Sequence, residues 1–382
     1  MNNNNIPVMP VSKIIRDLGL LFTPLINNNL PYSQIPSPFL WGPPGVGKSD
    51  AIKQLAESLE ISTGKKVKVT DIRLLLFSPI DLRGVPVADE NKQFTDWLKP
   101  RILDLDPSED TVNILFLDEL SAAPVSVQAS AYQLTLNRAI GEHRLPDNTI
   151  VVAAGNRTTD RSVAFKMPSA LANRMMHFEA SVDFKSWSEW AVSKGEVHPL
   201  VLAYLSFDNS KLYLEDSSLQ EVAFPTPRSW MFVSNILNTL SAEGDLEKYR
   251  SLITSCVGAG CAGEFIAFSK KFGKIPNIED IFEGKISEAP KELDLLYSIV
   301  SSMVTFAVSK ERNNEYGGLL MDEVENASRY LSIIPVDFAV NFLRQISGEE
   351  TLATKFAKSK NLRAWENKHN KILTKTGINF NV

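Results

Sequence analysis

Cysteine and histidine are scarce in this chain of 382 residues, which has two cysteines and four histidines. Two cysteines exclude a scaffold held together by several disulfides. Cys256 and Cys261 lack the second ligand pair of a zinc site, so buried thiols are the favoured interpretation. The histidines are dispersed along the chain. The sequence therefore indicates no metal site built from cysteine and histidine.

Neither sign of charge dominates, because 40 Lys and Arg stand against 45 Asp and Glu, a net charge of −5. A protein that coats nucleic acid with its whole surface would be basic, so that class is disfavoured. A local basic segment does exist at residues 355–375, where Glu366 is the one acidic residue. We interpret it as a solvated helix face, since Trp365 alone provides no stacking array for bases.

Long hydrophobic runs are also lacking. The apolar stretch at residues 297–308 is interrupted by serines and is shorter than the ~20 residues of a membrane span. The sequence opens with Asn2–Asn5 and shows no basic segment followed by an apolar one, so we expect no signal peptide. These features predict a cytoplasmic protein without a membrane segment.

Short apolar runs alternate with helical periodicity between residues 38 and 180, after a lead-in at residues 1–37. The predicted strands are residues 39–41, 67–72, 112–117, 150–154 and 176–180. Apolar residues recur at helical spacing from Ile52 to Leu59, and a second helix is predicted at about 124–138. Short buried strands alternating with helices predict an α/β fold with a parallel sheet between helices.

The pattern becomes mostly helical after residue 180, with no second series of strands. We therefore predict four segments. They are a lead-in at 1–37, an α/β domain at 38–180, a helical lid at 181–261 and a helical C-terminal extension at 262–382.

Residues 42–49 fit the phosphate-loop pattern G-x-x-x-x-G-K-[ST], between an apolar strand and an amphipathic helix. Glycines let backbone N–H groups curl around a polyphosphate, and the helix N-terminus attracts the anion. Lys48 is expected to reach the β- and γ-phosphates of ATP, and the Ser49 hydroxyl to bind Mg²⁺. The alternative is an ordinary glycine-rich turn. The expected nucleotide-binding residues are Gly42, Pro43, Pro44, Gly45, Val46, Gly47, Lys48, Ser49 and Asp50.

An acidic pair, Asp118 and Glu119, follows the buried strand at 112–117. Ligands bind at the carboxyl ends of strands in open α/β sheets. Asp118 can hold Mg²⁺, and Glu119 can accept a proton from an attacking water. Alone, the pair could be a strand end or a helix cap, but the phosphate loop upstream favours the catalytic interpretation.

Three further polar residues are candidates. Asn156 follows the strand at 150–154 and could position the water, although Gly-Asn is also a common turn pair. Arg174 could act in trans on a neighbour's γ-phosphate, or be an exposed residue at a helix end. Arg228 stands at a helix start after two prolines, where a cation opposes the helix dipole and so suggests an anion nearby.

Together these motifs resemble AAA+ ATPases of the MoxR type, in the clade with a helix-2 insert, over roughly residues 36–235. The segments that carry the resemblance are residues 40–49, 81–86, 115–120, 141–156, 167–174 and 224–230. The resemblance implies Walker A at 42–49 and Walker B at Asp118 and Glu119. It further implies that Asn156 is sensor 1, that Arg174 is the arginine finger and that Arg228 is sensor 2. Arg157 and Arg161 are alternative fingers, since Asn173 stands where many relatives have aspartate.

The resemblance also implies a homo-oligomeric ring, usually a hexamer, with ATP between subunits. An insert at 81–100 and a hairpin at 141–146 would project toward the pore, which makes Trp97 and His143 candidates for partner contact. The implied function is Mg²⁺-dependent ATP hydrolysis that remodels a protein partner, in this group often one with a von Willebrand A domain. The alternatives are a motor on nucleic acid and an ATP-dependent scaffold without turnover, but an intact catalytic set argues against the scaffold.

Overall fold

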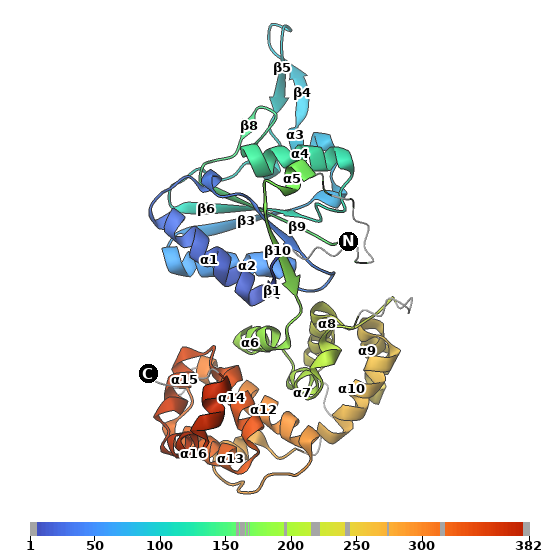
Figure 1. Ribbon diagram of the computed structural model, residues 1–382. Coiled ribbons are helices and arrows are strands. Elements are labelled where there is room, and N and C mark those ends of the chain that lie inside the picture. Colours follow the sequence, from blue (N-terminus) through green and yellow to red (C-terminus); the bar gives the residue numbers. More distant parts are fainter. Residues whose placement is uncertain are drawn as a thin grey trace. The chain divides into compact units, whose positions relative to one another are not determined.

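The computed structural model describes residues 6–157, 160, 165, 167, 169–194, 197–214, 222–240, 245–272, 275–313 and 318–376. The chain divides into two compact units, residues 1–182 and 183–382. The first unit carries a sheet between helices, and the second is built of helices in its described part (Figure 1). The predicted α/β fold with a helical C-terminal region is confirmed. Each unit is described by itself.

A six-stranded parallel sheet with the order β1-β10-β2-β9-β6-β3 forms the centre of the first unit. The strands are β1 (Val8–Pro10), β2 (Pro38–Trp41), β3 (Lys66–Arg73), β6 (Thr111–Asp118), β9 (Thr149–Gly155) and β10 (Met176–Ser181). All five predicted strands are present. Trp41 pairs with Gly155, and Leu117 pairs with Ala153. This register brings the carboxyl ends of β2, β6 and β9 to one edge of the sheet, where the predicted motifs begin.

Alternate residues of the central strands feed two hydrophobic cores, as the pleat requires. Ile114 and Phe116 of β6 pack with α1 (Val11–Asn27) and α2 (Lys48–Thr63) on one face. Leu115 and Leu117 pack with α4 (Val125–Asn137) on the other. Both β6 and β9 are buried along their whole length. The parallel sheet is therefore covered on both faces, as the continuous apolar runs predicted.

The predicted lead-in at 1–37 is integrated into this unit. Residues 8–10 form β1, which pairs with β10 at the edge of the sheet, and α1 supplies Ile14, Leu18 and Phe22 to the core. A short 3₁₀ helix, η1 (Tyr32–Gln34), then leads into β2. The three-residue β1 has no periodicity of its own, so its pairing depends on a strand far along the chain.

Two small antiparallel hairpins lie where the family resemblance places an insert and a hairpin. The first pairs β4 (Val85–Ala88) with β5 (Thr95–Leu98), and the second pairs β7 (Ala139–Ile140) with β8 (His143–Arg144). The first follows η2 (Leu74–Leu76) and α3 (Pro79–Arg83), and η3 (Arg101–Leu103) comes after it. The β4–β5 hairpin extends away from the sheet (Figure 1).

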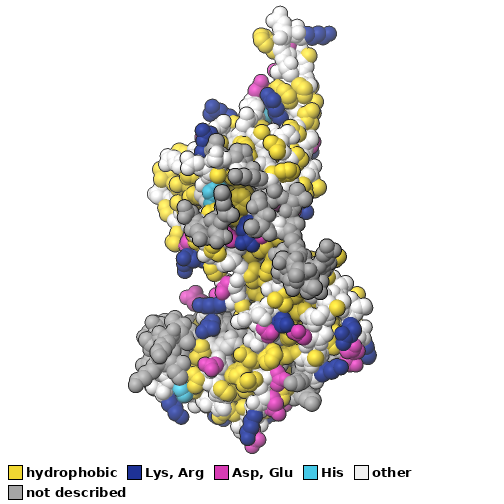
Figure 2. Space-filling model, turned by 45° about the vertical axis from the view of Figure 1, so that its right-hand side comes forward, with side chains coloured by type: hydrophobic (Ala, Val, Ile, Leu, Met, Phe, Trp, Pro, Cys, Tyr) yellow, Lys and Arg dark blue, Asp and Glu magenta, His cyan; other side chains and the backbone are white. Residues whose placement is uncertain are grey.

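Arg83 connects these two hairpins. Its guanidinium lies 4.5 Å from the ring centroid of Trp97, and a Cβ built on Gly141 would be 3.4 Å from its Nε. The Trp97 ring therefore packs against the Arg83 guanidinium and does not stand free on the hairpin. Apolar side chains on and beside the first hairpin are exposed instead, namely Leu76, Ile80, Val85, Phe94 and Leu98. Figure 2 shows hydrophobic side chains over this end of the unit.

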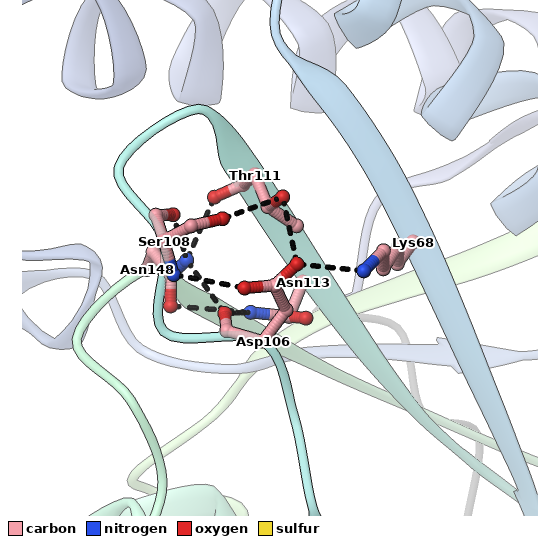
Figure 3. Close-up of polar contacts among 6 residues, drawn as sticks. All are labelled: Lys68, Asp106, Ser108, Thr111, Asn113 and Asn148. Carbon is pink, nitrogen blue, oxygen red and sulfur yellow. Dashed lines mark hydrogen bonds and ion pairs between the residues drawn. The ribbon is translucent and has the colours of Figure 1, made fainter.

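A polar cluster joins the amino ends of β6 and β9, at the edge opposite the motifs (Figure 3). Asp106 accepts from Lys68 at 2.6 Å and from Thr111 at 3.1 Å. Asn113, which is buried within β6, donates to the backbone oxygen of Asp106 and to Asn148. The Lys68 bond and the Ser108 amide hold the pKa of Asp106 well below its usual value. The cluster satisfies a polar side chain inside the sheet, so its role is structural.

The described elements of the second unit are all helices, joined by loops. Its helices are α6 (Phe184–Lys194), α7 (Pro199–Phe207), η4 (Asn209–Leu212), α8 (Pro227–Thr239), η5 (Leu246–Tyr249), α9 (Arg250–Val257), α10 (Ala259–Phe272), α11 (Ile278–Phe282), α12 (Leu293–Asn313), α13 (Met321–Ile333), α14 (Val336–Ile346), α15 (Glu350–Lys358) and α16 (Lys360–Thr376). Helix α10 runs across residue 261, so the lid and the extension predicted on either side of it are not divided there. Cys261 and Ala262, on either side of the predicted boundary, are buried residues of this helix.

Helix α12 is long and apolar enough to cross a membrane by length and composition, over Leu293–Arg312. The core helix of a soluble protein passes the same test, and 56% of this segment is buried inside the unit. Its buried side chains include Ile299, Met303 and Ala307. The apolar run that seemed interrupted in the sequence is thus part of a 21-residue helix at the centre of the helical unit.

Candidate functional site

The phosphate loop joins β2 to α2. Gly47 is the N-cap of α2 in a left-handed conformation with φ 104°, and Gly45 also has a positive φ of 79°. A Cβ on Gly47 would meet nothing within 4 Å. Glycine is therefore favoured there because of its positive φ, and not because a side chain would clash. The helix therefore begins at Lys48, which places its N-terminal turn directly at the loop.

The Lys48 ammonium is hydrogen-bonded within the phosphate loop and to Asn156. Its Nζ donates to the backbone oxygen of Gly42 at 2.6 Å and of Pro43 at 3.1 Å. It also donates to Oδ1 of Asn156 at 2.8 Å. Lysine is a point charge with three donors, so it can exchange such neutral acceptors for phosphate oxygens. The contact brings together two residues that the sequence analysis assigned to one site although they are far apart in the chain.

Ser49 and Asp118 form the second link between motifs. The Ser49 hydroxyl donates to Oδ2 of Asp118 at 3.0 Å. The other oxygen, Oδ1, accepts the backbone N–H of Glu119 at 2.8 Å, and the Asp118 residue is 6% exposed. A hydroxyl and a carboxylate in contact at a phosphate loop are oxygen donors of the kind that Mg²⁺ binds.

Glu119 has an uncommon backbone for a residue with a side chain, with φ 57°. Such conformations are concentrated at functional sites because the surrounding structure must hold them. Its Oε2 is buried and has no hydrogen-bond partner among the described residues. An unpartnered carboxylate oxygen in the same turn as Asp118 is available to accept a proton from water.

Ser121 was not singled out from the sequence, yet it ties this turn to Asn156. Its hydroxyl donates to the backbone oxygen of Asn156 at 3.0 Å, and Leu120 N–H donates to Ala154 at 2.9 Å. A Cβ on Gly155 would lie 2.4 Å from the Ser121 Oγ, so glycine permits this close approach. The turns after β6 and β9 are therefore held together, which places Glu119 and Asn156 in one site.

Asp71 of β3 is an acidic residue near Asp118 that was not singled out from the sequence. Burial, followed by the negative charge of Asp118, raises the pKa of its carboxyl group above the ordinary value. Arg73 and Lys53 oppose that shift. Its place near the end of a predicted strand was the signal that could have found it.

The candidate arginines have different surroundings. Arg157 is paired with Asp160 at 2.8 Å and with Glu179, so its guanidinium is engaged within its own unit. Arg174 is exposed after α5 (Ser169–Ala172), as a residue acting in trans would be. Arg161 lies outside the described residues. Arg228 is exposed in the first turn of α8, in the second unit, so it is not placed relative to the phosphate loop.

The residues present fit a nucleotide with Mg²⁺. Ser49 and Asp118 would hold the ion, since they are oxygen donors in contact with each other, and the Oε2 of Glu119 is unpartnered within the described chain. In the part of the chain that the structure describes, no group of three or more His, Cys, Asp or Glu forms another metal site.

The sheet-bearing segment is similar to one known family. Residues 38–184 match the family model described as "ATPase family associated with various cellular activities (AAA)". No curated protein matches the chain.

The chain is similar to several solved structures at low identity. One is PCH-2 of C. elegans, with 14% identity, 67% of this chain and 67% of that chain covered, and a TM-score of 0.36. Another is a RuvB mutant of Thermotoga maritima, with 14% identity, 81% and 86% covered, and a TM-score of 0.37. A third is from the E. coli MS115-1 HORMA:CdnC:Trip13 complex, with 12% identity, 68% and 88% covered, and a TM-score of 0.34. Likenesses at this level carry no argument about function. Residues 38–184 thus match the AAA family model and have a parallel α/β fold consistent with a P-loop ATPase domain.

Proposed function

We propose that this protein is a Mg²⁺-dependent AAA+ ATPase that assembles into a ring and uses ATP hydrolysis to remodel a protein partner. The observation that carries the proposal is the convergence of Lys48, Ser49, Asp118 and Asn156 through direct hydrogen bonds at one edge of the sheet. A glycine-rich turn with a merely structural role would not need a lysine, a hydroxyl, a carboxylate and an amide in contact.

In the proposed reaction, each residue acts on the polyphosphate or on the attacking water. The phosphate-loop N–H groups and Lys48 bind and orient the β- and γ-phosphates. Glu119 accepts the proton of water, and Asn156 orients that water beside the γ-phosphate. Mg²⁺, held by Ser49 and Asp118, would neutralise the charge on the transferred phosphoryl group. Arg174 of a neighbouring subunit would stabilise the same charge from outside.

The partner class follows from the resemblance and from the surface. A ring, commonly of six subunits, acting in the cytoplasm on a protein that carries a von Willebrand A domain is the proposed context. The exposed apolar side chains around the β4–β5 hairpin, among them Phe94 at 72% exposure, offer a surface for protein contact. The basic segment at residues 355–375 is weak support for a nucleic-acid motor. One of its lysines, Lys355, is paired with Glu311 at 2.7 Å.

Two substitutions separate binding from turnover. Lys48→Ala should abolish nucleotide binding, because it removes the cation of the phosphate loop. Glu119→Gln should keep binding and lower turnover by about 100-fold or more, since an amide cannot accept the proton. Lys53→Ala is the matched control, because Lys53 is an exposed lysine on the same helix. Binding is measured with a fluorescent ATP analogue, and turnover by phosphate release with Mg²⁺.

The proposal fails if Glu119→Gln hydrolyses ATP at the wild-type rate, or if Lys48→Ala binds nucleotide as tightly as Lys53→Ala. Turnover that rises with added DNA and not with added protein would favour the nucleic-acid motor.

A further inference from the structure

A hydrogen-bonded pair of aromatic side chains adjoins the phosphate loop. Trp41 is the last residue of β2, directly before Gly42. Its indole Nε1–H donates to Nδ1 of His177 on the neighbouring strand β10, at 3.0 Å. The two rings stack with centroids 6.1 Å apart, and the ring of Phe39 packs 4.2 Å from that of Trp41. His177 is therefore held against the strand that delivers the loop.

The second ring nitrogen of His177 reaches helix α5. Nε2 lies 2.7 Å from the backbone oxygen of Ala172. An indole N–H can only donate and a carbonyl can only accept, so the imidazole must be neutral with its hydrogen on Nε2. Both nitrogens are used, and the ring has a single orientation in which it bridges β2 and α5.

This bridge ends two residues before Arg174. Helix α5 has only four residues, too few to be stable through its own hydrogen bonds. The position of the Arg174 backbone therefore depends on tertiary anchors. Those described are the bond from His177 to Ala172, the burial of Met175 at 7% exposure, and the Met176 N–H bond to Ser37.

We propose that His177 is a positioning residue that links a subunit's own phosphate loop, through Trp41, to the arginine it presents to a neighbour. The inference rests on the proposed ATP hydrolysis with Arg174 acting in trans. A neutral imidazole clamped between an indole and a carbonyl transmits a shift of β2 to α5, and Arg174 moves with that helix end.

The test is a double-mutant cycle between His177 and Arg174. His177→Phe keeps a ring of similar size and removes both nitrogens. We expect kcat to fall about tenfold, with KM for ATP and nucleotide affinity within about twofold of wild type, because a small misplacement costs turnover more than binding. In an Arg174→Ala background the same substitution should cause no further loss of kcat, since the residue being positioned is gone.

The chain offers a matched control. His369 of α16 bonds through Nδ1 to the backbone oxygen of Trp365, and its ring lies 5.0 Å from the Trp365 ring. His369→Phe thus disturbs a similar Trp–His pair in the other unit, and it should leave kcat unchanged.

A second measurement needs no turnover. Amide hydrogen exchange of residues 169–176 in nucleotide-free protein should be faster in His177→Phe than in wild type, and unchanged in His369→Phe. Where His177→Phe fails to fold, Trp41→Phe removes the indole donor while keeping an aromatic ring, and it enters the same cycle. Losses of kcat that multiply in the double variant, or exchange that does not change, overturn the positioning role while the ATPase stands. A wild-type protein with no turnover removes the ATPase and the positioning role together.

Discussion

Glu119 and Gly155 show how tightly the two central turns are built. Glu119 adopts a left-handed backbone, and Gly155 leaves only enough space for the Ser121 hydroxyl. The first feature is energetically unfavourable for a residue with a side chain, and the second allows only glycine at its position. Their coincidence at the ends of β6 and β9 is what the proposed hydrolysis requires, because the proton acceptor and the water-orienting amide must keep a constant separation.

Gly155→Ala should destabilise the protein by about 1–3 kcal/mol, because the new methyl group would overlap Ser121 and the backbone would have to move. The same movement should lower kcat by displacing Asn156. Gly19→Ala in α1 is the matched control, since its Cβ would meet only Ser58 Oγ at 3.9 Å. It should stabilise the helix by up to about 1 kcal/mol. Urea unfolding and steady-state ATPase assays check both substitutions, and equal unfolding midpoints would contradict the argument.

Residues within local motifs could be predicted from the sequence, whereas residues that act through distant contacts could not. Lys48, Ser49 and Asp118 belong to short patterns whose chemistry is readable from spacing alone. Ser121 and His177 have unremarkable neighbours, and their partners lie 35 and 136 residues away. Such pairs arise from the register between strands of the sheet. That register cannot be predicted from a single sequence.

At the scale of elements, burial decided which predictions succeeded. Strands β6 and β9 are buried on both faces, so their continuous apolar runs identified them. Strand β1 is three residues long, and the β7–β8 hairpin has two residues in each strand, too short for any periodicity. Helix α10 passes through the boundary predicted at residue 261.

Helix α7 provides an element-scale prediction through its N-cap. His198 Nδ1 accepts the N–H of Leu200, and burial lowers the pKa of His198 to about 4. The unfolded chain titrates near 6.5, so it binds more protons than the folded chain between those values. The stabilisation from neutral His198 is therefore complete above about pH 6.5 and is lost as pH falls toward 4.

Asparagine is also a good N-cap and does not titrate, so His198→Asn should flatten this part of the pH dependence. Between pH 7 and pH 4, the free energy of unfolding of wild type should fall by up to about 3 kcal/mol more than that of the variant. Urea unfolding at both pH values, followed by circular dichroism, measures the difference. Parallel losses in the two proteins would show that His198 does not titrate in this range.

At the scale of the whole molecule, the proposed mechanism divides the site between two copies of the chain. The loop, the acidic pair and Asn156 lie in residues 1–182, Arg174 is exposed, and Arg157 is occupied by carboxylates of its own unit. In the proposed mechanism, a second copy of the chain brings Arg174 to the ATP phosphates. The rate per subunit should therefore rise with protein concentration and then level off.

Mixing two strongly impaired variants tests the shared site directly. Glu119→Gln has no proton acceptor but keeps Arg174, whereas Arg174→Ala keeps the acceptor and lacks the arginine. In a 1:1 mixture that assembles at random, about a quarter of interfaces combine an intact site with an intact arginine, so up to roughly a quarter of wild-type turnover should return. A mixture of Lys48→Ala with Glu119→Gln has no intact catalytic site at any interface and serves as the control. Recovery in the first mixture alone places Arg174 in the neighbour's reaction. No recovery, with both variants shown to co-assemble, would place the stabilising cation elsewhere in the chain.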